Sequence, residues 1–322
     1  MSLRTPHLLE PYLSLPPEST LLLLTSVLGA STNWLVLRHL HSLLKPSTST
    51  PLPSPGIGKN GETPEANGGG DTAVLLVSFL RDRAFWKENL ARLGVDLDAA
   101  ARRGRFGYVD GLGGLFGGGL SQQQEQQQQL TATGTGTAQK RQVEWQRTLT
   151  SAVPGEIGRV VLEGVGVLGK RAASVASGGN EDGEGRKVVL VIDGLDFVLA
   201  ALDPYPSVGP GSNRGEAGTA EAVKTMVMEW REKTHAVIVT LAGDDPLIRE
   251  HETTLEKQHA WFALSLAHEA DTILSLRLLD TGAAKDVSGV IRITHKGANA
   301  EDHEYLYHVG GDGGVRVFER GQ

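Results

Sequence analysis

The sequence predicts an α/β protein with a doubly wound, mainly parallel sheet that ends in antiparallel strands. Short apolar runs rich in β-branched residues alternate with segments of helical spacing from residue 21 to residue 267. Stretches rich in Gly, Pro, Ser and Gln separate many of these segments and read as loops at their ends. From residue 272 onward the pattern changes to successive strand-like runs with turn residues between them, which is typical of a meander.

The predicted strands are short apolar runs, as expected for strands that are buried on both faces of a parallel sheet. In the parallel part they are Leu21–Val27, Ala73–Phe79, Phe106–Val109, Val188–Ile192 and Ala236–Leu241. In the meander they are Thr272–Leu278, Gly289–Thr294, Glu304–His308 and Val315–Phe318, with the turn Gly310–Gly314 before the last strand.

The predicted helices show apolar residues at intervals of three and four, with capping residues at several ends. Ser31 or Thr32 is expected to cap the first, and Gly94 to stop the second. Glycines weaken the prediction for the helix that begins at Ile157. In order, the helices are Thr32–Leu44, Asp82–Leu93, Asp98–Arg103, Val143–Leu149, Ile157–Ala173, Leu195–Leu202, Glu216–Lys233 and Thr253–Ala267.

Residues 1–322 are predicted to form a single domain, because the strands and helices alternate without a break in type. Residues 46–71 and 111–139 are predicted to be disordered insertions, since their Pro, Gly, Ser, Thr and Gln content cannot bury enough apolar area. Residues 177–185 and 203–218 are expected to be loops of the same kind.

Composition excludes several classes of function. There is no cysteine, so disulfides and thiolate metal sites are excluded. The net charge of -7 means that contact with nucleic acid needs a local basic patch. We expect no signal peptide. Residues 21–37 are uncharged and just long enough for a membrane span, but polar residues in their middle favour a strand, a turn and a helix.

The run Lys187–Asp196 resembles the acidic strand of a P-loop ATPase, in which a buried strand delivers an Asp to a magnesium-nucleotide site. Asp193 therefore has two interpretations: it coordinates magnesium, or it only marks the end of a strand. Asp196 lies near the first turn of the next helix, where a carboxylate suits the helix dipole. We favour the structural interpretation because the matching phosphate loop is degenerate.

A phosphate loop requires G-x-x-x-x-G-K-[ST] between a strand and a helix. The turn at residues 26–33 has the right length, but Ser26 and Ser31 replace the glycines. Thr32 replaces the lysine, and Asn33 replaces the hydroxyl residue that binds magnesium. We predict a degenerate nucleotide site, formed by Ser31, Thr32, Asn33 and Asp193, that does not hydrolyse ATP by itself. The alternative is an active RecA-like ATPase, which the acidic strand alone favours.

Other patterns predict little chemistry. The glycine-rich run Gly111–Gly119 follows a strand, as a dinucleotide fingerprint would, but a glutamine tract follows it, so a loop is favoured. His251, His259 and His268 lack the spacing of metal ligands. No G-x-S-x-G elbow supports serine hydrolysis. We therefore expect no catalytic residue, no metal and no cofactor.

The loops after the strands ending near Asp193 and Leu241 carry isolated cations. Arg214 lies in the first loop, and Arg249 and Lys257 in the second. In ring-forming RecA-like proteins such loops can face the central opening, so these three residues are the predicted contacts with a nucleic-acid backbone. Ordinary surface charge is the alternative for each of them.

Several motifs together resemble a known family, the sixth subunit of the Elongator complex. They are Val74–Leu80, Leu93–Leu97, Arg103–Leu112, Val188–Asp196, Asp286–Arg292 and Tyr305–His308. The two low-complexity insertions look like fungal loop extensions of the compact family pattern. The resemblance implies a RecA-like fold without a usable phosphate loop.

The same resemblance implies a function and partners. It implies a non-catalytic subunit that joins the fourth and fifth Elongator subunits in a hetero-hexameric ring. The ring would bind tRNA and support modification of wobble uridines, in the cytoplasm with the nucleus as a second location, and without a membrane. Trp86, Trp230 and Trp261 either fill the core of the chain or belong to the partner interface.

Overall fold

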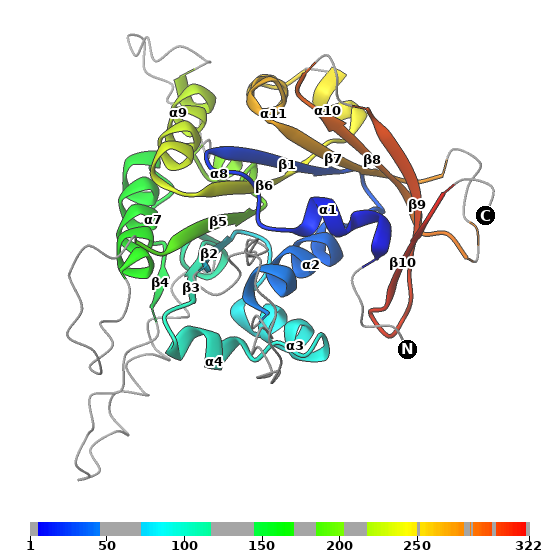
Figure 1. Cartoon of the computed structure of the whole chain (residues 1–322). Coiled ribbons are helices and arrows are strands. Elements are labelled where there is room, and N and C mark those ends of the chain that lie inside the picture. The colour runs from blue at the N-terminus through cyan, green and yellow to red at the C-terminus, as the bar shows by residue number, and fades with distance from the viewer. Residues whose placement is uncertain are drawn as a thin grey trace, which may run out of the picture.

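A computed structural model describes most of the chain and shows one mixed sheet of ten strands with helices on both faces (Figure 1). The described residues are 6–45, 72–116, 145–170, 185–202, 218–249, 252–279, 284, 286–297 and 301–319. The sheet order is β10-β9-β8-β7-β1-β6-β5-β2-β3-β4. The strands from β7 to β4 pair in parallel, and β8, β9 and β10 extend the sheet with antiparallel pairs.

The predicted strands are present with small shifts at their ends. They are β1 (Thr20–Ser26), β2 (Thr72–Ser78), β3 (Phe106–Asp110), β5 (Lys187–Asp193), β6 (Ala236–Ala242), β7 (Thr272–Arg277), β8 (Gly289–His295), β9 (His303–Val309) and β10 (Val315–Phe318). The predicted α/β fold class, mainly parallel with antiparallel strands at the C-terminal end, is confirmed. A tenth strand, β4 (Gln146–Thr148), was not predicted.

The helices form two layers. On one face lie α1 (Glu10–Leu13), α2 (Asn33–Leu44), α3 (Arg83–Arg92) and α4 (Leu97–Arg102). On the other face lie α7 (Pro154–Gly169), α8 (Phe197–Leu202), α9 (Gly218–Lys233) and α11 (Thr254–Glu269). Three short helices complete the described part: η1 (His7–Leu9), α5 (Leu112–Phe116) and α10 (Asp245–Arg249).

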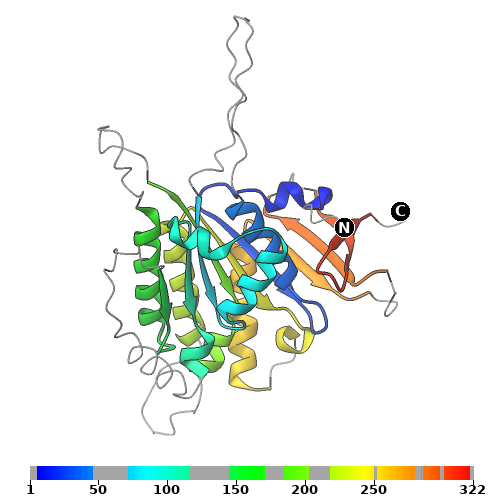
Figure 2. The same ribbon diagram turned by 90° about the horizontal axis from the view of Figure 1, so that it is seen from below.

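The core is divided by the sheet, because successive side chains of a strand point to opposite faces. On β1, Leu22 and Leu24 belong to the cluster under α2, whereas Leu21 and Leu23 belong to the cluster under α9 and α11. Figure 2 shows the parallel strands enclosed between the two helix layers, with β8 to β10 projecting to one side. Burial on both faces explains why the parallel strands are continuous apolar runs.

The helix predicted over Val143–Leu149 is wrong, because residues 146–148 form β4 instead. The strand lies at the edge of the sheet, where the Tyr108 N–H donates to Trp145 O at 3.1 Å. The Leu149 N–H donates to Asp110 O at 2.8 Å. These bonds to β3 outweigh a weak local helix preference. Residues 143–144 lie outside the described residues.

The loop expected from Gly111 begins with a helix, α5, whose first turn is held by the Asp110 carboxylate. Asp110 Oδ1 accepts from the N–H groups of Leu112 and Gly113 at 3.0 and 2.8 Å. Residues 117–139, and the whole predicted insertion 46–71, lie outside the described residues.

The tryptophans divide between the two interpretations. Trp86 and Trp230 are fully buried in the two core clusters of the chain. Trp261 on α11 is 40% exposed, together with Leu264 on the same helix and Phe197 at the start of α8. Core packing therefore accounts for Trp86 and Trp230, while Trp261 belongs to the surface.

Candidate functional site

The carboxyl ends of the parallel strands meet at one edge of the sheet, where ligands bind in open α/β folds. The strands end in polar or small residues there: Ser26, Ser78, Asp110, Asp193 and Ala242. The turn after β1 and the start of α2 lie at this same edge. This edge of the sheet therefore contains the residues of the predicted degenerate nucleotide site.

Asp193 is fully buried and joins three neighbouring strands. Its Oδ2 accepts a hydrogen bond from Ser78 Oγ on β2 at 2.8 Å. Its Oδ1 accepts from Thr240 Oγ1 on β6 at 3.4 Å. Thr240 Oγ1 in turn accepts from the Gly194 N–H at 2.7 Å. Both carboxylate oxygens are thus engaged by hydroxyl groups inside the protein.

The protonation of Asp193 reflects this environment. Burial raises the pKa of its carboxyl to about 6, mainly because the charged form loses its hydration. The hydrogen bond from Ser78 and the positive charge of Arg81 oppose that shift in pKa. A carboxylate held in this way serves the packing of β2, β5 and β6, which agrees with the structural interpretation.

The turn between β1 and α2 uses four of its backbone N–H groups within the protein. The Leu28 N–H donates to Asp244 Oδ1 at 2.6 Å. The three other bonds are Val27 N to Leu276 O at 3.2 Å, Ala30 N to Val27 O at 2.9 Å and Asn33 N to Ser31 Oγ at 3.2 Å. A phosphate loop needs such groups to point at its ligand. Here a carboxylate of the chain itself accepts from one of them.

Ser31, Thr32 and Asn33 are brought together at the start of α2, as predicted. Thr32 is the N-cap residue and is buried, but its side chain caps no N–H group of the helix. Ser31 makes the side-chain bond instead, to the Asn33 N–H. The residue at the lysine position is therefore a buried, neutral hydroxyl.

A second polar cluster lies between α8, α11 and β6. His259 Nε2 is 3.6 Å from Asp196 Oδ2, and both side chains are buried. The Ala242 N–H donates to the same Asp196 oxygen at 3.3 Å. Asp196 Oδ1, both ring nitrogens of His259 and Gln258 Oε1 have no hydrogen-bond partner among the described residues. No sequence spacing indicated this cluster, since Asp196 and His259 lie far apart along the chain.

Asp196 was expected to lie near the first turn of α8, and it does immediately precede that helix. Its carboxylate, however, bonds to β6 and faces His259. Over the described residues, no group of three or more His, Asp or Glu side chains could hold a metal ion.

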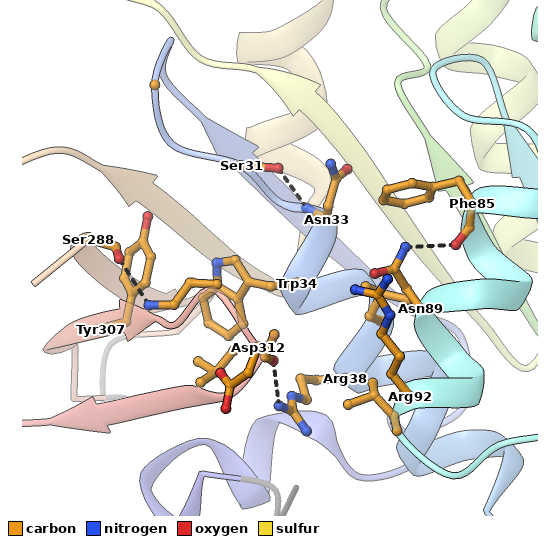
Figure 3. A pocket seen from close by; sticks show the side chains of 16 residues that line it. Ser31, Asn33, Trp34, Arg38, Phe85, Asn89, Arg92, Ser288, Tyr307 and Asp312 are labelled. Atoms are coloured by element: carbon orange, nitrogen blue, oxygen red, sulfur yellow. Dashed lines mark hydrogen bonds between the residues drawn. The ribbon is translucent and has the colours of Figure 1, made fainter. Parts of the chain in front are cut away.

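A pocket of about 380 Å³ opens beside the turn, between α2, α3 and the β9–β10 hairpin (Figure 3). Trp34 and Tyr307 form one wall, with ring centroids 5.1 Å apart, and Phe85, Asn89 and Arg92 face them. This pocket was not predicted, because its walls come from segments that are distant in the sequence.

The pocket is lined by polar as well as apolar side chains, and its polar members are Ser31, Asn33, Arg38, Asn89, Arg92, Ser288, Tyr307 and Asp312. The buried Arg38 donates to Gly313 O at 3.4 Å, and Asn89 Nδ2 donates to Phe85 O at 2.8 Å. Trp34 Nε1 is buried and has no acceptor among the described residues. With this mixed lining, the pocket can take a group that is partly apolar and partly polar.

The predicted nucleic-acid contacts are only partly described. Arg214 lies outside the described residues. Arg249 is exposed on α10 and lies 3.5 Å from Asp245 Oδ1. Lys257 is exposed on α11, one residue after Glu256. Acidic neighbours thus accompany the two cations that the structure places at this edge.

The fold rules out a phosphate loop at one other glycine-rich run. Residues 164–170 fit the first seven positions of the phosphate-loop motif, with Arg171 in place of Ser or Thr. Residues 154–169 are helical, and the end of α7 lies at the opposite edge of the sheet, next to the start of β5. This run therefore cannot form a phosphate loop.

Comparison with known proteins supports the fold and goes no further. No family model matches the chain, and no curated protein matches it. An uncharacterised protein of Pyrococcus horikoshii, solved with an unknown peptide, has a TM-score of 0.51 at 13% identity, over 95% of this chain and 94% of that one. A KaiC-like protein of the same organism has a TM-score of 0.48 at 13% identity, over 94% and 91%. The fold is RecA-like.

Proposed function

We propose that the chain is a non-catalytic subunit of the Elongator accessory ring, which binds tRNA and supports modification of wobble uridines. The observation that carries this proposal is the turn after β1. Four of its N–H groups donate to acceptors within the protein, and the Asp244 carboxylate is one of these acceptors. Buried Thr32 occupies the position of the lysine. Such a turn lacks the charge that a triphosphate requires.

Asp193 supports the same conclusion. A magnesium ligand must present its oxygens to the metal, whereas both oxygens of Asp193 accept bonds from Ser78 and Thr240. The raised pKa of this carboxyl follows mainly from its burial. The chain would act through its partners, the fourth and fifth Elongator subunits.

Exposed apolar side chains on α8 and α11 form the surface that we propose for such partners. Phe197, Trp261 and Leu264 are 41%, 40% and 49% exposed, and α8 contacts α11. Exposed aromatic and leucine side chains grouped on adjacent helices are typical of protein interfaces. None of the described helices is long and apolar enough to cross a membrane.

Co-purification tests the assembly. The full chain is mixed with the fourth and fifth Elongator subunits of the same species, and the mass of the complex is measured by light scattering. We expect a hetero-hexamer that binds tRNA. Trp261→Glu with Leu264→Glu should prevent assembly, whereas Val167→Glu, at an equally exposed apolar position on α7, should not. A chain that stays monomeric in the mixture contradicts the proposal.

Hydrolysis of ATP by the isolated chain is the second test, because it separates the proposal from an active RecA-like ATPase. We expect no turnover above that of Asp193→Ala. Steady turnover that disappears in Asp193→Ala would establish the ATPase instead. Arg214, Arg249 and Lys257 remain the predicted tRNA contacts.

A further inference from the structure

Seven cationic residues gather at the opposite edge of the sheet, where the parallel strands begin. Some end α4 or directly follow α2, α4 and α7, and the others directly precede β3 or β5 or begin β5. Figure 2 shows the ends of α2 and α7 and the starts of β2 and β5 along this edge, at the top of the view. We call these residues the basic edge: Lys45, Arg102, Arg103, Arg105, Lys170, Arg186 and Lys187.

Hydrogen bonds join the members of the basic edge into one surface. Arg105 donates to Leu43 O and Leu44 O at 2.9 and 3.3 Å, which places it beside Lys45. Arg186 Nη1 donates to Gly104 O at 2.6 Å, between Arg103 and Arg105. The Arg186 N–H donates to Gly169 O at 3.0 Å, which brings Lys170 and Lys187 to the same place.

Two of the seven have a structural role. Arg105 and Arg186 bond to carbonyl groups at helix ends and turns, where a cation is stabilising. The other five are exposed: Lys45, Arg102, Arg103, Lys170 and Lys187. None of these five forms an ion pair with an acidic residue in the described part of the chain. The dipoles of α2, α4 and α7 favour cations at these helix ends, and no carboxylate of the described residues neutralises the five exposed ones.

The basic edge contrasts with the rest of the molecule. The chain as a whole has a net charge of -7, and the carboxyl edge carries Asp110, Asp196, Asp244 and Asp245. A local basic patch on an acidic protein concentrates a polyanion at one place, because the remaining surface repels it. Exposed lysines and arginines without a fixed arrangement contact phosphates rather than base edges.

We propose that the basic edge binds the phosphate backbone of an RNA without regard to its sequence. The inference rests on the proposed function for the identity of that RNA, tRNA. It places the main contact at the amino-terminal edge of the sheet, away from Arg249 and Lys257. Arg102, Arg103 and Lys187 are expected to carry it, since they are exposed and come from two elements that Arg186 joins.

The test is the affinity for tRNA of the full chain, alone and in the assembled ring, measured by fluorescence anisotropy at several salt concentrations. The test variant is Arg102→Gln/Arg103→Gln/Lys187→Gln. We expect the slope of log affinity against log salt to fall by about 2, and affinity at ~0.1 M salt to fall roughly tenfold for each cation that is neutralised. Arg102→Lys/Arg103→Lys/Lys187→Arg retains the charges and should retain both the slope and the affinity.

The matched control is Arg292→Gln/Lys296→Gln/Arg316→Gln, which neutralises three exposed cations on the antiparallel extension and should change the slope less than the test variant. Thermal unfolding of every variant distinguishes weaker RNA binding from loss of the fold. An unchanged slope in the test variant overturns the proposal, as does failure of the wild-type chain and ring to bind tRNA at low salt. Loss of ring assembly with RNA binding intact would make the basic edge a protein interface and also overturns it.

These results are separable from the proposed function. A chain that does not assemble with the fourth and fifth subunits, but binds RNA with a slope that depends on Arg102, Arg103 and Lys187, refutes the ring and retains the basic edge. A ring that assembles and binds tRNA equally well with the test variant retains the proposed function and refutes the basic edge.

Discussion

At the scale of the residue, Asp193 shows how a side chain associated with catalysis can serve structure. Its carboxylate accepts bonds from Ser78 on β2 and Thr240 on β6, so it fixes the ends of three strands relative to one another. The interaction depends on hydroxyl groups that are 115 and 47 residues away in the chain.

The raised pKa of Asp193 predicts a pH dependence of stability. The folded protein holds this proton up to about pH 6, whereas the ordinary value is 3.8, so the stability that the protonated group contributes is lost as pH rises through about 6. Asp193→Asn removes the titration. Relative to wild type, we expect the variant to gain up to about 3 kcal/mol in unfolding free energy between pH 4 and pH 7.

Urea denaturation at several pH values measures this difference. Asp245→Asn, which removes an exposed carboxylate, serves as the control. A difference between Asp193→Asn and wild type that stays constant from pH 4 to pH 7 would show that the carboxyl is not desolvated as described.

Some of these residues could be predicted from the sequence alone, and others could not. It placed Asp193 at a strand end, and Ser31, Thr32 and Asn33 at a helix start, because each lies beside a strongly patterned element. It could not find Asp244, which accepts from Leu28, or the Asp196–His259 pair. Those contacts are set by strand order, and a single sequence does not encode strand order in any local pattern.

At the scale of the element, α7 shows that glycines in one helix have different roles. A Cβ at Gly164 would overlap the ring of Trp145, whereas a Cβ at Gly166 would meet no atom within 4 Å. Gly164 therefore permits the close approach of α7 to the residue that precedes β4. Gly166 lies on the exposed side and only lowers helix propensity.

Alanine substitutions should separate the two glycines. Gly166→Ala is expected to raise the unfolding free energy by about 0.5–1 kcal/mol, because the unfolded chain loses freedom and the helix gains propensity. Gly164→Ala is expected to lower it by about 1–3 kcal/mol through overpacking. Chemical denaturation with unchanged m-values measures both. Equal effects of the two substitutions would contradict the packing of Trp145 against α7.

The elements that the sequence predicted are those with strong apolar patterns. All nine predicted strands were found because each is buried on at least one face. β4 was mistaken for a helix because its three residues are exposed and show no hydrophobic periodicity. The short helices α1, α5 and α10 were not predicted, since fewer than two turns give too few residues for a pattern.

At the scale of the whole molecule, β1 holds the two parts of the sheet together. It pairs with β6 of the parallel part on one side and with β7, which begins the antiparallel extension, on the other. The sheet is therefore continuous through a strand near the N-terminus. The parallel part and the extension should unfold together rather than as separate units.

Leu24→Ala tests this coupling, because Leu24 is fully buried at the centre of β1. We expect the unfolding free energy to fall by about 2–5 kcal/mol through loss of apolar packing and the cavity left behind. Amide protection, measured by hydrogen exchange, should fall by the same free energy in β5, β6, β7 and β8. Leu264→Ala, at an exposed position, should change little. Loss of protection confined to β7 and β8 would mean that the extension opens independently.

The central position of β1 also has a consequence for synthesis on the ribosome. The apolar run Leu21–Leu24 is synthesised long before its two neighbouring strands, which begin only at Ala236 and Thr272. At about 5–20 residues per second, the run waits roughly 10–40 s for the first of them. Until then the nascent chain exposes an apolar strand without its partners. Efficient production of this protein should therefore depend on chaperones that shield Leu21–Leu24 until β6 and β7 have been synthesised.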